Sequence, residues 1–237
     1  MWFNCFIIIA VWLSALNLSG SGNHRPTAEP LRVVVLGNSI VAHPPAEELG
    51  WLGNWGMAAS VRDSDFVHRL ERRLHEMNPQ GTLEYGSVSG FEREYRHFDL
   101  DLLANYRNAD ILVVKISENV DPDSLGERQF LRHYGQLIDY LAPDNRTAVV
   151  ICDGFWPSPV NDTIRHFARQ RGFDFVQLHD LYTSDSTNSA RGLFAHEGVA
   201  NHPSDRGMAH IADRIWQKLA PHIRQRQLIT KNQLSNE

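Results

Sequence analysis

Four residues of the types that acyl transfer uses are spread along this sequence, each in a short motif. Ser39 ends a Gly-Asn-Ser motif, Gly90 ends Ser-Val-Ser-Gly, Asn119 lies in Ser-Glu-Asn-Val, and His202 precedes a proline. Acyl transfer through a serine needs a nucleophile, a base that accepts its proton, and hydrogen-bond donors for the oxyanion. A serine, a histidine, an asparagine and a glycine can supply these parts, so the first hypothesis is nucleophilic catalysis.

The elements that must position these residues follow from hydrophobic patterning. Short apolar runs typical of buried strands alternate with segments whose apolar residues have helical spacing. We expect strands at 31–36, 82–88, 111–116, 147–152 and 173–178, and helices at 65–77, 123–141, 160–171 and after Ser204. Ser64 is placed to cap the first helix and Ser204 the last. The alternation predicts one α/β domain: a single doubly wound (flavodoxin-like) fold with about five mainly parallel strands and helices on both faces.

The four residues fall where such a fold places its chemistry. Ser39, Gly90 and Asn119 each follow an expected strand, and His202 stands just before the last expected helix. In open parallel sheets the active site lies outside the carboxyl ends of the strands. The order along the chain therefore predicts that the four residues meet at one edge of the sheet.

This order and spacing resemble the SGNH (GDSL-type) hydrolase family over about residues 31–219. The motifs depart from the family's usual pattern, because Asn38 replaces the Asp of Gly-Asp-Ser and Val199 replaces the Asp of Asp-x-x-His-Pro. The third motif keeps Asn119 but lacks the usual Gly and Asp around it. The strings GNSIVAHPP, GWLGNWGMAAS, FEREY and HEGVANHPSDRGM are similar to a secreted bacterial subgroup of the family.

The resemblance implies a role for each residue. Ser39 is expected to attack the ester carbonyl, and His202 to act as general base and then as acid for the leaving alcohol. The backbone N–H groups of Ser39 and Gly90 and the side-chain amide of Asn119 are expected to form the oxyanion hole.

The group that orients His202 stays open, because Val199 cannot replace a carboxylate. Glu197 is the nearest acid before the histidine, Asp205 lies three residues after it, and Asp153 follows the fourth strand. A backbone carbonyl would also serve, giving a Ser–His dyad. We favour the dyad or Glu197. With a dyad we expect an apparent pKa for His202 close to the ordinary value of about 6.5.

Two further features concern the surroundings of the site. Trp51, Trp55 and Trp156 follow the first and fourth strands, where aromatic faces would suit sugar rings, although plain packing explains them equally well. Lys115 interrupts an apolar strand, and a buried lysine needs a partner, for which Glu118 and Glu92 are the candidates.

Composition bounds the rest of the interpretation. The 237 residues carry a net charge of −5 and only two cysteines, so we expect no nucleic-acid partner, no disulfide framework, no metal site and no cofactor. Residues 1–22 resemble a signal peptide or an N-terminal anchor, 23–30 a linker, 31–223 the hydrolase domain and 224–237 a polar tail. We therefore expect a secreted or periplasmic protein with no membrane partner after signal cleavage; its oligomeric state stays open.

The functional hypothesis is a secreted serine esterase that hydrolyses carboxylic esters through an acyl-enzyme. Its substrate is expected to be a small-molecule or carbohydrate ester, above all O-acetyl groups on carbohydrate. The alternatives are a lipid esterase or thioesterase with the same machinery, and a non-catalytic carbohydrate-binding protein of the same fold. Whether water or a sugar hydroxyl receives the acyl group is left open.

Overall fold

A five-stranded parallel sheet forms the centre of the molecule. The computed structural model describes residues 30–144 and 146–235. The strands are β1 (Arg32–Gly37), β2 (Thr82–Ser87), β3 (Ile111–Lys115), β4 (Ala148–Cys152) and β5 (Asp174–Val176). Their spatial order is β2-β1-β3-β4-β5, and every neighbouring pair is parallel. This is the flavodoxin-like order of a doubly wound sheet, so the predicted fold class is confirmed.

Apolar strand residues are buried on both faces of this sheet. In β1, Val33 and Val35 point into one core cluster, whereas Val34 and Leu36 point into the other. A strand with two buried faces needs a continuous apolar run rather than an alternating one. That requirement is why the run in β1 was recognisable in the sequence.

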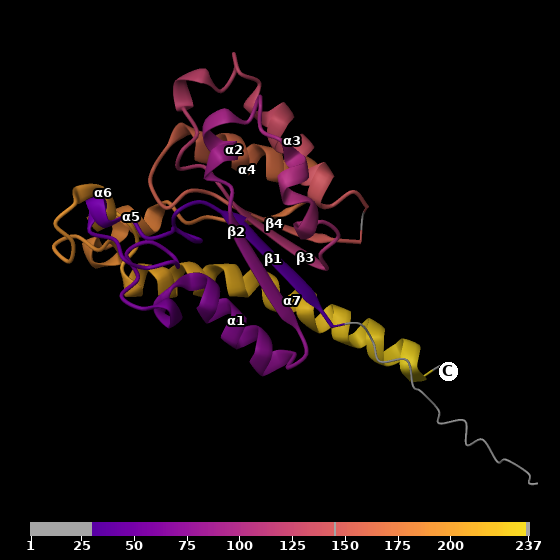
Figure 1. The fold of residues 1–237 in the computed structure, drawn as a ribbon. Helices are drawn as coiled ribbons and strands as arrows, with labels where there is room; N and C mark the ends of the chain where they lie inside the picture. Colours follow the sequence, from indigo (N-terminus) through magenta and orange to yellow (C-terminus); the bar gives the residue numbers. More distant parts are fainter. Residues whose placement is uncertain (1–29, 145, 236–237) are drawn as a thin grey trace, which may run out of the picture.

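Helices cover both faces (Figure 1). The helices are α1 (Phe66–Met77), α2 (Ser89–Glu94), α3 (Phe130–Leu141), α4 (Pro159–Arg171), α5 (Asp180–Ser184), α6 (Glu197–Ala200) and α7 (Asp205–Ser235). Helices α1 and α7 pack on one face, and α2, α3 and α4 on the other. The short helices α5 and α6 lie beyond the carboxyl ends of the strands, and the site described below lies there as well.

Two helix starts differ from the expectation. The helix predicted over 123–141 begins only at Phe130, because Gln129 has a left-handed φ of 54° that interrupts the helical path. A separate 3-10 turn covers Pro122–Ser124. At α1 the capping residue is Asp65 rather than Ser64, since the Asp65 carboxylate accepts the backbone N–H of His68 at 2.8 Å.

The carboxyl-terminal segment is helical. Residues 224–237 were expected to be a polar tail, but α7 continues from Asp205 to Ser235. The first part of this extension contacts the domain, since the Gln227 amide donates to the carbonyl of Met77 at 2.7 Å. The predicted cap is present at its start, because Ser204 Oγ accepts the N–H of Gly207 at 3.2 Å. The predicted leader (1–22) and all of the predicted linker (23–30) except Pro30 lie outside the described residues.

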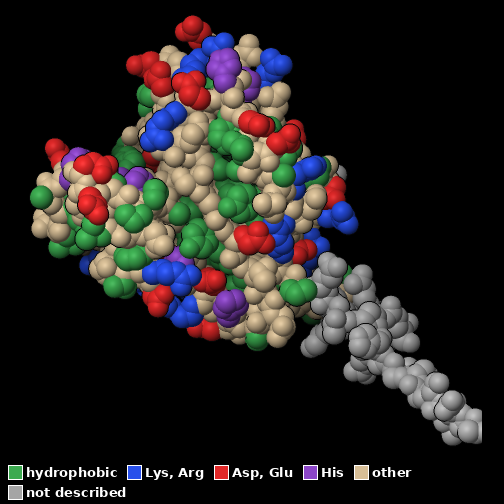
Figure 2. Space-filling model, viewed as in Figure 1, with side chains coloured by type: hydrophobic (Ala, Val, Ile, Leu, Met, Phe, Trp, Pro, Cys, Tyr) green, Lys and Arg blue, Asp and Glu red, His purple; other side chains and the backbone are tan. Residues whose placement is uncertain are grey.

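The surface in view mixes both signs of charge (Figure 2). Hydrophobic side chains gather in the middle of this face, where the edge strand β2 lies between the two helical layers. Within the described residues, no helix is both long enough and apolar enough to cross a bilayer.

Gly37 fixes the point at which β1 leaves the sheet toward Ser39. It pairs with Ser87 of β2 and Lys115 of β3, and a Cβ atom on it would lie 2.5 Å from the Lys115 carbonyl oxygen. We expect Gly37→Ala to lower the unfolding free energy by about 1–3 kcal/mol, as overpacking does. Gly126→Ala is the control, since nothing lies within 4 Å of its Cβ position. Equal melting temperatures of the two variants, measured by circular dichroism, would contradict this account.

Candidate active site

Ser39 and His202 are in direct contact. The Ser39 hydroxyl oxygen lies 2.8 Å from Nε2 of His202, although 163 residues separate them in the chain. The loop after β1 holds the serine, since the Ser39 carbonyl accepts the N–H of Met57 at 2.8 Å. The side chain of Ser39 is half-buried, so its hydroxyl is positioned at an accessible edge of the sheet.

A backbone carbonyl holds the other side of the histidine ring. Nδ1 of His202 lies 2.7 Å from the carbonyl oxygen of Gly198, which can only accept a hydrogen bond. Nδ1 therefore carries the proton, and Nε2 presents a lone pair to the Ser39 hydroxyl. The indole of Trp156 packs edge-on against the imidazole, with the two ring centroids 5.2 Å apart, and limits the rotation of the histidine ring. This tautomer is the one that a general base requires.

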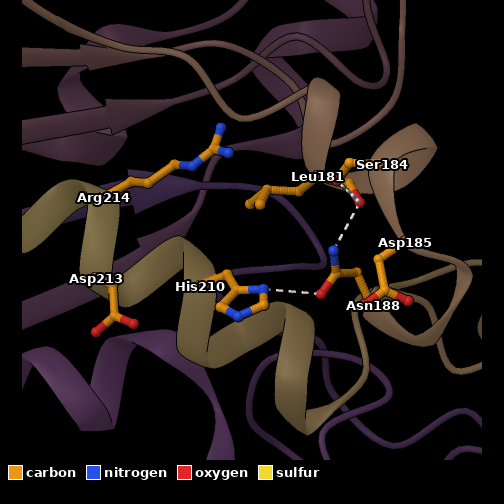
Figure 3. A pocket seen from close by; sticks show the side chains of 7 residues that line it. All are labelled: Leu181, Ser184, Asp185, Asn188, His210, Asp213 and Arg214. Carbon is orange, nitrogen blue, oxygen red and sulfur yellow. Dashed lines mark hydrogen bonds between the residues drawn. The ribbon is translucent and has the colours of Figure 1, made fainter.

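A cluster around Asn188 anchors the loop that carries His202 (Figure 3). The buried Asn188 amide donates to the Leu181 carbonyl at 2.8 Å, and its side-chain oxygen lies 2.9 Å from Nδ1 of His210 in α7. The Asn188 carbonyl accepts the N–H of Ser204, and the His202 carbonyl accepts the N–H of Ala190, both at 2.9 Å. These contacts tie the loop to α7. The hollow in Figure 3 is lined by residues of this cluster and by neither Ser39 nor His202.

The acidic candidates for orienting His202 lie elsewhere. Glu197 is exposed at the start of α6, and the ring nitrogen it was expected to hold is bonded to the Gly198 carbonyl. Asp205 accepts the N–H and hydroxyl of Ser60 at 2.8 and 2.6 Å. Asp153 pairs with His179 at 2.6 Å. Within the described chain, no carboxylate bonds to His202, and the geometry is that of a Ser–His dyad.

Val199, which stands where the family has its aspartate, does not face the histidine. Its side chain is 1 % exposed and belongs to an apolar cluster with Trp51, Met57 and Ala190. Only its carbonyl serves the site, by accepting the backbone N–H of His202 at 2.9 Å. Valine at position 199 thus contributes to an apolar cluster and offers no carboxylate to His202.

Strand register brings the expected oxyanion donors to the same edge. Gly37 lies opposite both Ser87 and Lys115, so the segments after β1, β2 and β3 leave the sheet side by side. Gly90 is exposed in the first turn of α2, where backbone N–H groups have no partner within the helix. The Asn119 amide donates one hydrogen to Glu92 at 2.6 Å and keeps a second for a ligand.

Buried charges lie directly beneath these donors. Lys115 pairs with Glu118, which is one of its two predicted partners. Burial alone would raise the pKa of Glu118, but the Lys115 ammonium group, together with hydrogen bonds from the Phe155 N–H and the Asn38 amide, holds that pKa below the ordinary value. The other candidate, Glu92, contacts Asn38 and Asn119 instead, and burial followed by the Glu118 charge raises its pKa. The sequence suggested Glu92 only as a partner for Lys115 and gave no sign of its contacts with Asn38 and Asn119.

The tryptophans are mainly structural. Trp51 is 3 % exposed, donates its indole N–H to the His43 carbonyl and packs against Phe194, which agrees with the plain packing that the sequence left as the other explanation. Trp55 and Trp156 are half-buried, and their indole N–H groups donate to the carbonyls of Ala59 and Asn201. Trp156 alone touches the histidine.

Solved structures share this fold. A comparison with protein-family models found no match, and a search of curated proteins found none either. An acetyl xylan esterase, AlAXEase, is 18 % identical with a TM-score of 0.53, over 79 % of this chain and 99 % of that one. A two-domain esterase, CEX, active on acetylated mannans and co-crystallised with mannopentaose, is 18 % identical with a TM-score of 0.52 over 82 % of this chain. The match spans 50 % of the esterase's own length. A lipase from a goat rumen metagenome, Lip_vut3, is 15 % identical with a TM-score of 0.51, over 78 % of this chain and 95 % of that one.

The surroundings of His202 predict an acid-shifted pH profile. Burial lowers the pKa of His202 to about 4, and the hydrogen bond to the Gly198 carbonyl offsets only part of this effect, so the expected value near 6.5 is not retained. A base must be neutral to accept a proton, so activity is lost only as the pH falls through about 4. We expect kcat/KM for p-nitrophenyl acetate to stay constant from neutral pH down to about pH 5, with circular dichroism verifying the fold. A midpoint near 6.5 would contradict the burial argument.

The carbonyl-held ring predicts different outcomes for two substitutions in α6. Glu197→Gln should change kcat by less than about tenfold, because this carboxylate does not touch His202. Val199→Asp should lower the melting temperature without raising kcat/KM, because it buries an unpaired carboxylate in the apolar cluster. A large loss of kcat in Glu197→Gln with the fold intact, or a gain in Val199→Asp, would show that a carboxylate reaches the ring.

Proposed function

We propose that this chain is a serine esterase of the SGNH (GDSL-type) hydrolase family that cleaves carboxylic esters through an acyl-enzyme. The observation that carries this proposal is the 2.8 Å contact between Ser39 Oγ and a His202 ring whose tautomer leaves Nε2 free to accept a proton. Gly90 and Asn119 at the same sheet edge support it, as does the fold shared with several esterases.

The reaction follows from these contacts. Ser39 Oγ attacks the ester carbonyl while its proton moves to Nε2 of His202. The oxyanion that forms accepts hydrogen bonds from the backbone N–H groups of Ser39 and Gly90 and from the free hydrogen of the Asn119 amide. The protonated His202 then gives its proton to the leaving alcohol, which leaves an acyl-serine. Water, deprotonated by the same ring, attacks this ester and releases the acid and the free serine.

For the substrate we propose O-acetyl groups on carbohydrate, cleaved outside the cytoplasm. Two of the structurally similar proteins are described as an acetyl xylan esterase and as an esterase active on acetylated mannans. Export rests on the apolar run over residues 3–18, which has the length of a signal-peptide core rather than of a bilayer span.

A second candidate, a lipid esterase, is favoured by two exposed leucines that adjoin the apolar cluster around Val199. Leu52 is 73 % and Leu193 71 % exposed. They adjoin Trp51 and Phe194, whose rings are 6.2 Å apart in the same cluster as Val199. An aliphatic rim of this kind would suit a long acyl chain, and the similarity to a lipase agrees with it.

Labelling with a fluorophosphonate tests the reaction. We expect the reagent to modify wild-type protein at Ser39, because the adjacent imidazole raises the nucleophilicity of the hydroxyl. Ser39→Ala should fold normally and lose both labelling and hydrolysis of p-nitrophenyl acetate, and Ser60→Ala, at an exposed serine bonded to Asp205, is the control. Labelling of another serine would show that Ser39 is not the nucleophile. Absence of labelling and hydrolysis would favour the non-catalytic alternative.

Acyl-chain length separates the two substrate classes. Hydrolysis of p-nitrophenyl acetate and of acetylated xylan or mannan oligosaccharides, with little activity on octanoate esters, would support the carbohydrate proposal. A preference for octanoate that falls in Leu52→Ser and Leu193→Ser would replace it with the lipid alternative.

A further inference from the structure

A buried carboxylate in α2 joins two of the motifs around the nucleophile, the one that carries Ser39 and the one that carries Asn119. Glu92, in α2, is 0 % exposed, and its oxygens accept from the Ser117 backbone N–H at 2.7 Å, the Asn38 amide at 3.1 Å and the Asn119 amide at 2.6 Å. A buried carboxylate is costly unless its oxygens are hydrogen-bonded. The Asn119 backbone N–H adds a longer contact at 3.5 Å, so all the contacts of this carboxylate come from N–H donors in the segments that carry Ser39 and the expected oxyanion amide.

Two opposite groups determine which way the Asn119 amide points. Its nitrogen donates to Glu92, and its oxygen accepts from the Arg93 guanidinium at 2.8 Å. Turning the amide over would place its oxygen against a carboxylate and its nitrogen against a cation. The second amide hydrogen, the one available to an oxyanion, is therefore held in one direction.

The same network accounts for asparagine at position 38. The Asn38 amide donates to both Glu92, at 3.1 Å, and Glu118, at 2.6 Å. Lys115 compensates only one of these carboxylates, by its ion pair with Glu118. An aspartate here, as in the usual family motif, would bring a third carboxylate against the other two. Asparagine at position 38 is therefore explained by the two glutamates, because its amide donates a hydrogen bond to each of them.

We propose that Glu92 is a positioning residue of the oxyanion hole, which acts by fixing the Asn119 amide and, through Asn38, the turn that carries Ser39. This inference rests on the proposed esterase function. Glu92 does not touch the substrate, so its effect reaches the reaction only through the donors it holds.

Glu92→Gln tests the proposal with the shape of the side chain retained. Glutamine offers one acceptor oxygen and one amide group to three N–H donors, so at least one donor loses its partner. We expect kcat for p-nitrophenyl acetate to fall by about 10–10²-fold with KM nearly unchanged, somewhat less than the ~10²–10³ typical of losing an oxyanion donor outright. Glu94→Gln, on the same helix but exposed, is the matched control, with kcat expected within about twofold of wild type.

A double-mutant cycle distinguishes positioning from a general loss of structure. Asn119→Ala removes the donor itself, so adding Glu92→Gln to it should lower kcat by less than about threefold more. A wild-type kcat in Glu92→Gln, or losses that simply multiply in the double variant, would overturn the proposal. Either result would leave the esterase assignment intact, because that assignment depends on Ser39 labelling.

A measurement on the full chain without substrate decides the question even if no esterase activity is found. In ¹⁵N NMR spectra, with signals assigned through Asn119→Ala, one Asn119 side-chain amide proton should be shifted downfield and protected from solvent exchange by its bond to Glu92. The protection should disappear in Glu92→Gln and persist in Glu94→Gln. An unprotected Asn119 amide in the wild-type protein would refute the inference, also in the event that Glu92→Gln does not fold.

Discussion

The hydrogen bond between Ser39 and His202 depends on both of its ends being held by separate parts of the fold. On one side, β1 is paired with β2 and β3 up to Gly37, so the position at which the chain leaves the sheet toward Ser39 is fixed by strand pairing. On the other, Ala190 donates its N–H to the His202 carbonyl, and the Asn188 side chain bonds to His210 of α7, so the histidine loop is tied to α7. Near-attack geometry tolerates little displacement, which explains why packing remote from the serine matters to the chemistry.

Replacing the usual aspartate by a backbone carbonyl changes how the base works. A carboxylate both orients the ring and stabilises the imidazolium, whereas the Gly198 carbonyl orients it and contributes only a dipole. Burial lowers the pKa of the ring to about 4, and the hydrogen bond to the Gly198 carbonyl offsets only part of this effect, so His202 is a weak base. In the proposed esterase reaction, more of the stabilisation of the transition state must then come from the expected oxyanion donors, of which the Asn119 amide is held by Glu92 and Arg93.

Burying the polar network below those donors costs desolvation free energy, which an apolar core in the same place would not. Glu92, Lys115 and Glu118 have side chains removed from solvent, and apolar residues of similar volume would often be no less stable. Their contacts are satisfied by Asn38, Asn119 and backbone N–H groups, so the network is directional rather than merely compact. Directionality is what an oxyanion hole needs, because its donors must be in place before charge develops.

The sequence alone determined the fold class and the elements that bear the site. Continuous apolar runs such as residues 31–36 and helical stripes such as 65–77 are local signals, and the position of a motif after a strand already indicates the edge of the sheet to which it belongs. Helix ends were less predictable, since the start of α3 depends on the left-handed conformation of Gln129, which no pattern of apolar residues encodes.

Only the tertiary structure decided what each polar residue touches. The sequence left a choice between Glu197 and a backbone carbonyl as the partner of His202, and the path of one loop places the Gly198 carbonyl against the ring. The sequence left both sugar binding and packing open for Trp51, and the residue is buried, with Phe194 from a distant segment packed against it. Every residue has a backbone carbonyl, so residue types do not show which carbonyl will accept a hydrogen bond from a side chain. Contacts between segments far apart in the chain are set by packing, and the order of the residues does not reveal them either.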